Sequence, residues 1–539
     1  MFQKITKALL GVVFLGIISC AQTKQKSNTV HQNGIANKQN TQPNIVLIYA
    51  DDLGRGMLST YGQKIVKTPN IDRLANYGVK FENSYGSHYC SPARASLLTG
   101  MHDVRRDLFN TTTGGIYMKL DNGLSLEQIE EKIEKVMIPA KEEDVFLGQV
   151  AQQAGYATAE FGKLEWGFAT TAKRVKRHGW DYHFGYYDHR RCHGFYPPFL
   201  FRNGKKVAIP GNTHVDCAKG PDSESPENYK KRWDMTGKKV YSEHIIMDEM
   251  MSYMDRNHPK DTGKPFFIYF PTQLPHGPVA IPEVHADFKN NPNLTELEKE
   301  YASMVKMLDS DVGRIYNKLE AMGVLDNTII VFTSDNGHAM PYPKEGRLDD
   351  KRNIHTGQKY DDIKTKFYSE TSGDVFDGND GMAGFKRANW EGGSRVPLIW
   401  YWKDKFKSGT ISEQRVAGYD FMNTMAELIE TNPVKKSDGV SYAKTLFGGK
   451  SRERDYTVLS SHTMGPSLIT KDGWKLRYYI KKDVFQLYYL PNDYKEENNL
   501  ANEQPERLKT LKTLLLKECN GDWHNGLGPQ KMSYKLYGI

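Results

Sequence analysis

The chain has 539 residues, and 38 % of them are hydrophobic, which is enough apolar material for a large core. Its 73 Lys and Arg residues against 65 Asp and Glu residues give a formal charge of only +8, spread along the chain without a basic arm. This mild excess excludes a typical nucleic-acid-binding protein and is compatible with an anionic substrate.

The first 43 residues have the pattern of a targeting segment. Lys4 and Lys7 precede an apolar stretch at 8–18 that is too short to span a membrane comfortably and is typical of a signal peptide. The run ending at Cys20 (Ile-Ile-Ser-Cys) resembles a bacterial lipobox, in which the cysteine is lipidated; an ordinary secretory signal with an incidental cysteine is the alternative. We expect a signal peptide over residues 1–20 and a flexible tether over 21–43. The protein would then lie in the bacterial cell envelope, in the periplasm or at the outer membrane, with Cys20 as its only membrane anchor.

Apolar runs of strand length alternate with helix-like patterns in the main part of the chain. Residues 44–50 (NIVLIYA) form a continuous apolar run, as expected of a parallel strand that is buried on both faces. Further such runs lie at 264–271, 328–333 and 396–401, and helical patterns lie at 70–77 and 296–322. This alternation predicts an α/β fold over residues 44–440, a large, mostly parallel or mixed sheet flanked by helices.

The pattern changes after about residue 440. Short strand-like runs are separated by polar turns, at 456–459, 467–470, 474–480 and 485–490. Residues 505–519 then show a helical pattern with leucines on one side. We expect a smaller C-terminal subdomain over 441–539, an antiparallel sheet with one helix.

Polar side chains follow the ends of three predicted strands. Asp51 and Asp52 follow the first strand, His276 follows the second, and the run Asp335-Asn336-Gly337-His338 follows the third. The ligand crevice of an open α/β sheet lies at the carboxyl ends of its strands, so these residues can meet in one site. Their carboxylate and amide oxygens suit a hard cation, most simply Ca²⁺. Alone, an Asp-Asp pair after a strand is more often a helix cap.

The run at 90–100 (CSPARASLLTG) indicates a nucleophile at the start of a helix. Pro92 suits the first helical turn, so Cys90 would lie at the helix N-terminus, where free N–H groups and the dipole favour an anion. Arg94 lies about one turn further on and can turn back towards Cys90. These eleven residues resemble the signature of the type I sulfatases, in the alkaline phosphatase superfamily.

The resemblance implies a specific chemistry for Cys90. In that family the cysteine is oxidised to Cα-formylglycine by a separate maturing enzyme, which would be a partner of this chain. One hydroxyl of the hydrated aldehyde attacks sulfur, and the other loses its proton and expels sulfate. The resemblance also implies one Ca²⁺, held by Asp51, Asp52, Asp335, Asn336 and an oxygen of the modified residue 90.

Three further positions match the family's sulfate-binding residues. Lys163 ends a segment that resembles the strand with the sulfate-binding lysine, and His276 matches a sulfate-contacting histidine that can serve as general acid. Lys386 opens a block that resembles the family's Lys-x4-Glu-Gly-Gly-x-Arg-Val-Pro motif and would bind sulfate oxygens. The expected catalytic residues are therefore Cys90, Arg94, Lys163, His276 and Lys386.

The sequence departs from the family at Glu165, where a histidine usually hydrogen-bonds the formylglycine. Glu165 accepts a proton or points away, and another residue, such as His102, takes the histidine's place. His338 and Arg347 are further candidates for substrate binding, since an insert between residues 338 and 385 should lie over the cleft. The aromatic and basic stretch at 173–198 suits a sulfated sugar or is a well-packed surface loop.

These patterns predict a sulfuric ester hydrolase that removes sulfate from a sulfated poly- or oligosaccharide. A formylglycine-dependent phosphonate monoester or phosphodiester hydrolase is the nearest alternative, and an inactive, lipid-anchored glycan-binding protein is a second. Cys192 and Cys217 either pair in an oxidising compartment or remain free thiols. No nucleic-acid partner is expected.

Overall fold

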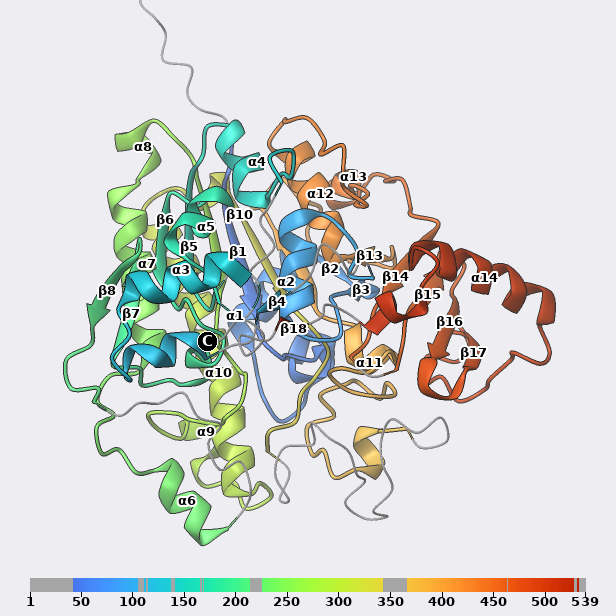
Figure 1. Cartoon of the computed structure of the whole chain (residues 1–539), viewed down its shortest axis with the longest axis horizontal. Coiled ribbons are helices and arrows are strands. Elements are labelled where there is room, and N and C mark those ends of the chain that lie inside the picture. Colours follow the sequence, from blue (N-terminus) through green and yellow to red (C-terminus); the bar gives the residue numbers. More distant parts are fainter. Residues whose placement is uncertain are drawn as a thin grey trace, which may run out of the picture. The chain divides into compact units, whose positions relative to one another are not determined.

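The computed structural model describes residues 42–104, 115–136, 141–164, 167, 169–213, 225–342, 366–462 and 464–527, and the backbone of 111–112 and 531–532. Its main element is a ten-stranded sheet in the order β12-β2-β11-β10-β1-β9-β5-β6-β7-β8 (Figure 1). The centre is parallel and consists of β10 (Thr328–Ser334), β1 (Asn44–Ala50), β9 (Phe266–Pro271) and β5 (Ala157–Gly162). The carboxyl ends of these four strands therefore lie at one edge of the sheet.

The outer strands make the sheet mixed. On one side β11 (Leu398–Tyr401) runs antiparallel to β10 and to β2 (Val79–Phe81), and β12 (Thr410–Ser412) runs parallel to β2. On the other side β6 (Tyr182–Gly185) is parallel to β5, followed by the antiparallel strands β7 (Phe199–Arg202) and β8 (Lys205–Ala208). The predicted α/β fold is confirmed, although the run at 396–401 forms an antiparallel strand, β11, and not a parallel one.

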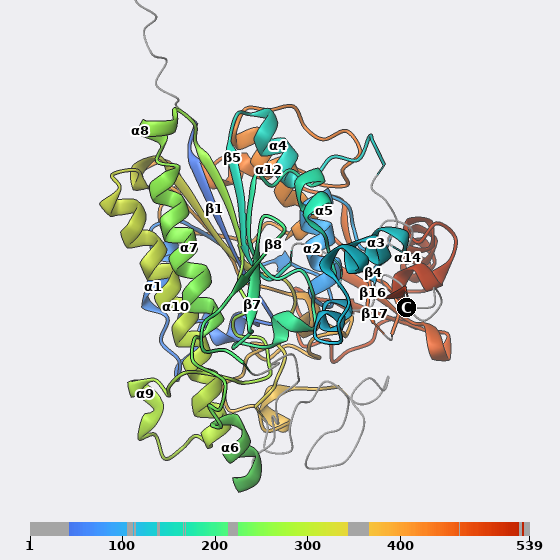
Figure 2. The same cartoon turned by 60° about the vertical axis from the view of Figure 1, so that its left-hand side comes forward.

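Alternate side chains of the central strands enter two separate cores, one on each face of the sheet. Val46 and Ile48 of β1 pack with α1 (Pro69–Asn76), α7 (Ser242–Arg256) and α10 (Glu296–Ala321). Ile45 and Leu47 pack on the other face, with α2 (Cys90–Thr99), α4 (Leu147–Gln153) and α12 (Phe421–Leu428). Figure 2 shows the sheet between these two helical layers. Burial on both faces explains the continuous apolar sequence of the strands.

Short elements connect these layers. The helices are α3 (Leu126–Val136), α5 (Ala172–Arg177), α6 (Pro226–Arg232), α8 (Pro259–Thr262), α9 (Ala286–Lys289), α11 (Glu391–Ser394) and α13 (Ala443–Leu446). The strands are β3 (Ser84–Tyr85) paired with β13 (Val416–Ala417), and β4 (Thr111–Thr112) paired with β18 (Lys531–Met532). Within the described ranges, no helix has both the length and the apolar character that a membrane crossing needs.

A second, smaller sheet follows the main one, as the sequence predicts. It is antiparallel and consists of β14 (Tyr456–Leu459), β15 (Ser467–Thr470), β16 (Trp474–Tyr479) and β17 (Val484–Tyr489). Helix α14 (Pro505–Glu518) packs on this sheet through Leu511 and Leu515. The ammonium group of Lys475 in β16 lies 2.9 Å from carboxylate oxygens of both Glu391 and Glu496, and all three side chains are completely buried. This ion cluster ties the small sheet to the Lys386–Pro397 block.

Several sequence predictions fall outside the described residues. They are the signal peptide, the tether as far as residue 41, the lipidation of Cys20, Glu165, Arg347, and Cys217 with its pairing to Cys192. Cys192 itself is buried with a free thiol.

Candidate active site

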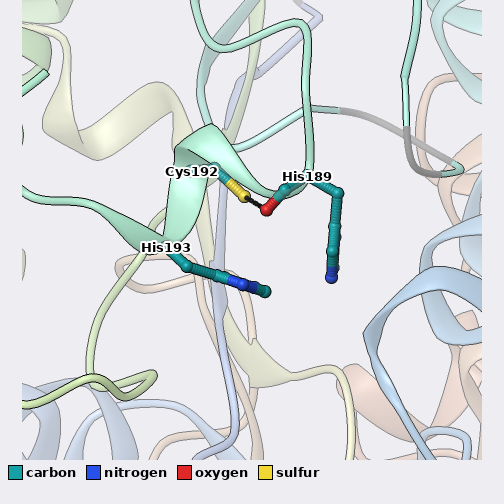
Figure 3. Close-up of side chains that lie close together, drawn as sticks. All are labelled: His189, Cys192 and His193. Carbon is teal, nitrogen blue, oxygen red and sulfur yellow. Dashed lines mark hydrogen bonds between the residues drawn. The ribbon is translucent and has the colours of Figure 1, made fainter. Parts of the chain in front are cut away.

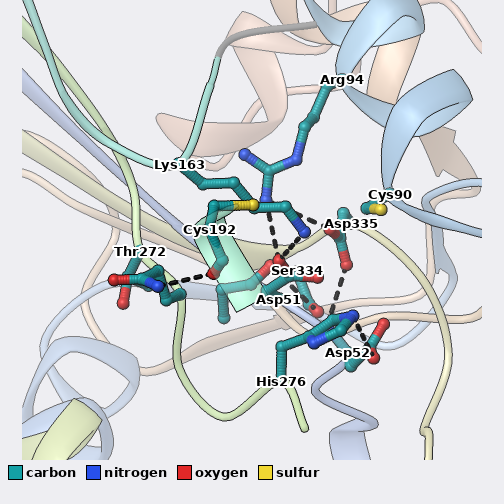
Figure 4. Close-up of polar contacts among 12 residues, drawn as sticks. Asp51, Asp52, Cys90, Arg94, Lys163, Cys192, Thr272, His276, Ser334 and Asp335 are labelled. Carbon is teal, nitrogen blue, oxygen red and sulfur yellow. Dashed lines mark hydrogen bonds and ion pairs between the residues drawn. The ribbon is translucent and has the colours of Figure 1, made fainter. Parts of the chain in front are cut away.

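The predicted site residues converge at the carboxyl edge of the sheet. Most of them follow a central strand or belong to α2, and Lys386 lies in the loop before α11; the parallel centre brings the strand ends together (Figure 4). All of them are buried: Asp51, Asp52, Cys90, Arg94, Lys163, His276, Asp335, Asn336 and Lys386. Segments that are more than 300 residues apart in the sequence thus contribute to one polar cluster.

Cys90 is the first residue of α2, as its sequence predicts. The preceding segment is fixed against the end of β10, where the Ser87 N–H donates to the Asp335 carbonyl at 2.9 Å. A Cβ at Gly86 would lie 2.1 Å from the same carbonyl, so only glycine allows this approach. Burial raises the pKa of the Cys90 thiol, although Lys163 opposes the rise. A buried thiol that keeps its proton is a poor nucleophile, so the site suits a modified Cys90 better than a cysteine thiolate.

The acidic side chains form a pocket of oxygens that fits a hard cation. Candidate ligand atoms of Asp51, Cys90 and Asp335 all lie within 4.8 Å of one another. Asp51 Oδ1 and Asn336 Oδ1 are buried, and neither has a hydrogen-bond partner in the described part of the chain. Burial and then repulsion by Asp51 raise the pKa of Asp335 to about 8. A divalent cation bound to these oxygens would offset the repulsion and satisfy the lone pairs.

Basic groups alternate with the carboxylates around Cys90. Lys163 forms a buried ion pair with Asp51, which raises the pKa of the lysine against the opposing effect of burial. Arg94 Nη2 lies 3.3 Å from Asp335 and 3.5 Å from Asp51. These contacts hold both cations at the start of α2, where they would face an anion bound near Cys90.

On the far side of the carboxylates, Lys386 and His276 meet at Asp52. Lys386 Nζ lies 2.5 Å from Asp52 Oδ1, and His276 Nε2 lies 3.3 Å from Asp52 Oδ2. The two nitrogens are 3.4 Å apart. Asp52 thus holds together a lysine, which supplies positive charge, and a histidine, which can supply a proton, as binding and cleavage of an ester of a strong acid require.

Two other candidate residues have different surroundings. The structure does not bring His102 to Cys90: its Nε2 lies 3.0 Å from Glu518 at the end of α14. His338 is completely buried, and its Nε2 is 2.7 Å from the hydroxyl of Tyr342, which donates to Asp374 at 2.5 Å. His338 is therefore packed against the loop that follows β10.

The structure brings three further residues to the site that the sequence does not place there: His189, Cys192 and His193 (Figure 3). His189 Nε2 lies 4.0 Å from Cys90 Sγ, and the ring of His193 stacks on His276. Burial and the neighbouring His193 and Lys163 hold the pKa of His189 well below its usual value. All three lie inside the aromatic and basic stretch at 173–198, but no motif distinguishes them from the other histidines there.

The fold and the site define a hydrolase of anionic esters on an alkaline phosphatase-like sheet. The sulfatase family model matches residues 43–431, and a model of the C-terminal part of N-sulphoglucosamine sulphohydrolase matches residues 381–520. The chain therefore belongs to the sulfatase family, the type I sulfatases that the run at Cys90 predicts.

Individual relatives extend this likeness over almost the whole chain. An N-acetylgalactosamine-6-O-sulfatase of Bacteroides thetaiotaomicron is 27 % identical over 95 % of this chain and 98 % of its own. A sulfatase structure from work on glycosaminoglycan metabolism in the same bacterium has a TM-score of 0.65 at 24 % identity, covering 89 % of this chain and all of that one. The phosphonate monoester hydrolase of Agrobacterium radiobacter also shares the fold, with a TM-score of 0.54 at 16 % identity over 88 % of this chain and 95 % of its own.

Proposed function

We propose that the protein removes sulfate from a sulfated carbohydrate, with Cys90 converted to Cα-formylglycine and with one bound Ca²⁺. The observation that carries this proposal is the buried Cys90 at a helix start, between the Lys163–Asp51 pair and the Lys386–Asp52–His276 group. A sulfate ester needs cationic partners for its oxygens and a proton for its leaving oxygen, and this arrangement offers both.

The four oxygen ligands suited to the cation are Asp51, Asp52, Asp335 and Asn336, together with an oxygen of the modified residue 90. When bound, Ca²⁺ would offset negative charge on the sulfate and polarise the nucleophile. The protein's own groups have separate tasks. Lys163 and Lys386 bind sulfate oxygens, and His276 Nε2 donates a proton to the sugar oxygen as the ester bond breaks.

Conversion of Cys90 to formylglycine explains how a buried cysteine can provide the nucleophile. A hydrated aldehyde has two hydroxyl groups: one forms the bond to sulfur, and the other allows the sulfated enzyme to discharge itself. Oxidation of Cys90 requires a separate formylglycine-generating enzyme, which we propose as a partner of the chain before its final folding. The start of α2 adds free backbone N–H groups beside the new anion.

The sugar is proposed from the named relative, an N-acetylgalactosamine-6-O-sulfatase that aligns over nearly the full length of both chains. N-acetylgalactosamine 6-sulfate is therefore the first substrate to test, followed by sulfated galactans and ulvan. We further propose that the protein acts in the bacterial cell envelope, anchored through lipidated Cys20. The apolar stretch before Cys20 and the polar segment after it support this location.

Two measurements test the proposal. The mass of the peptide that contains residue 90 should show an aldehyde in protein co-expressed with a maturing enzyme, and Cys90→Ala should abolish activity. Release of sulfate from the sugar panel should exceed release of phosphate or phosphonate from matched 4-nitrophenyl esters. A preference for the phosphonate or phosphate diesters would instead support the alternative hydrolase. Glycan binding without turnover, in protein that carries the aldehyde, would support an inactive binding protein.

A further inference from the structure

The turn that carries His189 is held rigidly beside the site. The buried Asp188 carboxylate accepts hydrogen bonds from the N–H groups of Gly115, Tyr117 and Arg190, at 2.8, 3.0 and 2.7 Å. The Cys192 thiol donates to the carbonyl of His189 at 2.9 Å. His189 is therefore positioned by its own turn.

A second contact connects this turn to the loop that carries His276. Gln273 Nε2 donates to the carbonyl of Cys192 at 2.5 Å and to that of Gly194 at 3.1 Å. Gln273 is almost completely buried and lies three residues before His276. The turn and the active-site loop thus form one unit, and movement of His189 away from Cys90 would break buried hydrogen bonds.

The imidazole of His189 faces the nucleophilic position. Its Nε2 lies 4.0 Å from Cys90 Sγ, and this sulfur marks the place of an oxygen in the hydrated formylglycine. The cations near Cys90 are Lys163, which is paired with Asp51, and Arg94, which contacts Asp335; the two carboxylates are the expected ligands of the metal ion. An imidazole nitrogen, unlike these cations, can accept a proton from a hydroxyl group.

Glu165 stands where the family usually has a histidine, and the topology of the sheet explains how His189 can take over the role of that histidine. The usual histidine follows the strand of Lys163, which is β5. His189 follows β6, the parallel neighbour of β5, with Gly162 opposite Gly185 in the register. A histidine that follows β6 therefore lies at the same edge of the sheet as one that follows β5. In this chain, the segment after β6 supplies the imidazole to the site, in place of the segment after β5.

We propose that His189 is a catalytic residue, the base that discharges the sulfated formylglycine. This inference rests on the proposed function. In the step, the free hydroxyl of the sulfated hydrate gives its proton to His189 Nε2, and the electrons of its O–H bond form the carbonyl. The carbon–oxygen bond to sulfate breaks, and sulfate leaves with the electron pair. The aldehyde is regenerated, and the proton passes from His189 to water.

The test uses full-length, matured protein and 4-nitrophenyl sulfate as the probe. His189→Ala should release about one nitrophenol per active site and then stall, with steady-state turnover lowered at least about 100-fold. The peptide that contains residue 90 should then carry an added sulfate, detected by its mass. Exposed His524, which is bonded to Asp522, supplies the control variant His524→Ala, which should turn over like the wild type and show no adduct.

Three results would overturn the assignment. Turnover of His189→Ala within about threefold of the wild type, without an adduct, would show that another group is the base. Loss of the initial burst, in a variant with a wild-type melting temperature and an intact aldehyde, would place His189 in the first step. An adduct in Glu165→Gln but not in His189→Ala would assign the step to Glu165. If the wild type lacks the aldehyde or does not hydrolyse the sulfate ester, the proposed function itself fails. The peptide mass and the turnover of the wild type distinguish this outcome from a failure of the His189 assignment alone.

Discussion

The imidazoles of His193 and His276 lie face to face, with ring centroids 4.1 Å apart and planes within 8°. His276 Nε2 is at the same time 3.3 Å from Asp52 and 3.4 Å from Lys386. The stack fixes the plane of the His276 ring, whereas the polar contacts fix the direction of its Nε2. A general acid needs both, because proton transfer depends on alignment with the leaving oxygen.

Replacement of His193 should therefore impair leaving groups that need a proton. We expect His193→Ala to lower kcat on a sugar sulfate by roughly 10- to 100-fold, and to lower kcat on 4-nitrophenyl sulfate by less than threefold. Nitrophenolate leaves without a proton, so the aryl ester serves as the internal control. His193→Phe keeps a flat ring against His276 and should recover most of the sugar-sulfatase activity. Equal losses on both esters would contradict a role through His276.

Calcium removal should weaken both folding and catalysis. Without a cation, Asp51 and Asp335 repel each other, and Asp51 Oδ1 and Asn336 Oδ1 stay buried without hydrogen-bond partners in the described part of the chain. We expect a chelator to lower the melting temperature by several degrees and to abolish turnover, and excess Ca²⁺ to restore both. Asn336→Ala should lower the Ca²⁺ affinity measured by calorimetry by at least about tenfold. A melting temperature that is insensitive to chelator and Ca²⁺ would speak against the site.

Much of this site can be predicted from the sequence because many of its residues come directly after buried strands. The run at 44–50 matches β1 residue for residue, since burial on both faces leaves a continuous apolar pattern that ends at Asp51. His189 could not be found in this way. Its closeness to Cys90 arises from the pairing of β5 with β6 and from the turn at Asp188, and neither leaves a periodic pattern. Likewise, no local pattern shows that Glu518, 416 residues further on, engages His102.

The buried Lys475 should be one of the strongest links between the small sheet and the main domain. Lys475→Met would leave the Glu496 carboxylate buried without its ion-pair partner and Glu391 with only the more distant Arg395, at 3.5 Å, which costs about 3–5 kcal/mol. Denaturant unfolding should report this loss. Activity should fall as well, because Glu391 belongs to the block that carries Lys386. Exposed Lys471, paired with Asp455 at 3.3 Å, offers the matched variant Lys471→Met, with an expected change below about 0.5 kcal/mol.

Glu243 should make the stability of the protein depend on pH. It is completely buried in α7, where the Thr272 hydroxyl donates to one of its oxygens, and burial raises its pKa to about 7. Between about pH 4.5 and 7, the folded protein holds a proton that the unfolded chain has released. The free energy of unfolding should therefore fall as the pH rises through this window.

Glu243→Gln removes the titrating group and keeps an oxygen that can accept from Thr272. Relative to the wild type, this variant should gain on the order of 1–3 kcal/mol between pH 5 and pH 8, measured by denaturant unfolding at both values. Exposed Glu283 provides the control, because Glu283→Gln should leave the difference between the two pH values unchanged. The pKa of Asp311 is raised by burial and by Glu243, so Asp311 contributes a pH dependence of the same sign, of which the variant keeps only the part caused by burial. Parallel stability curves for wild type and Glu243→Gln would show that Glu243 is already ionised at pH 5 in the folded protein.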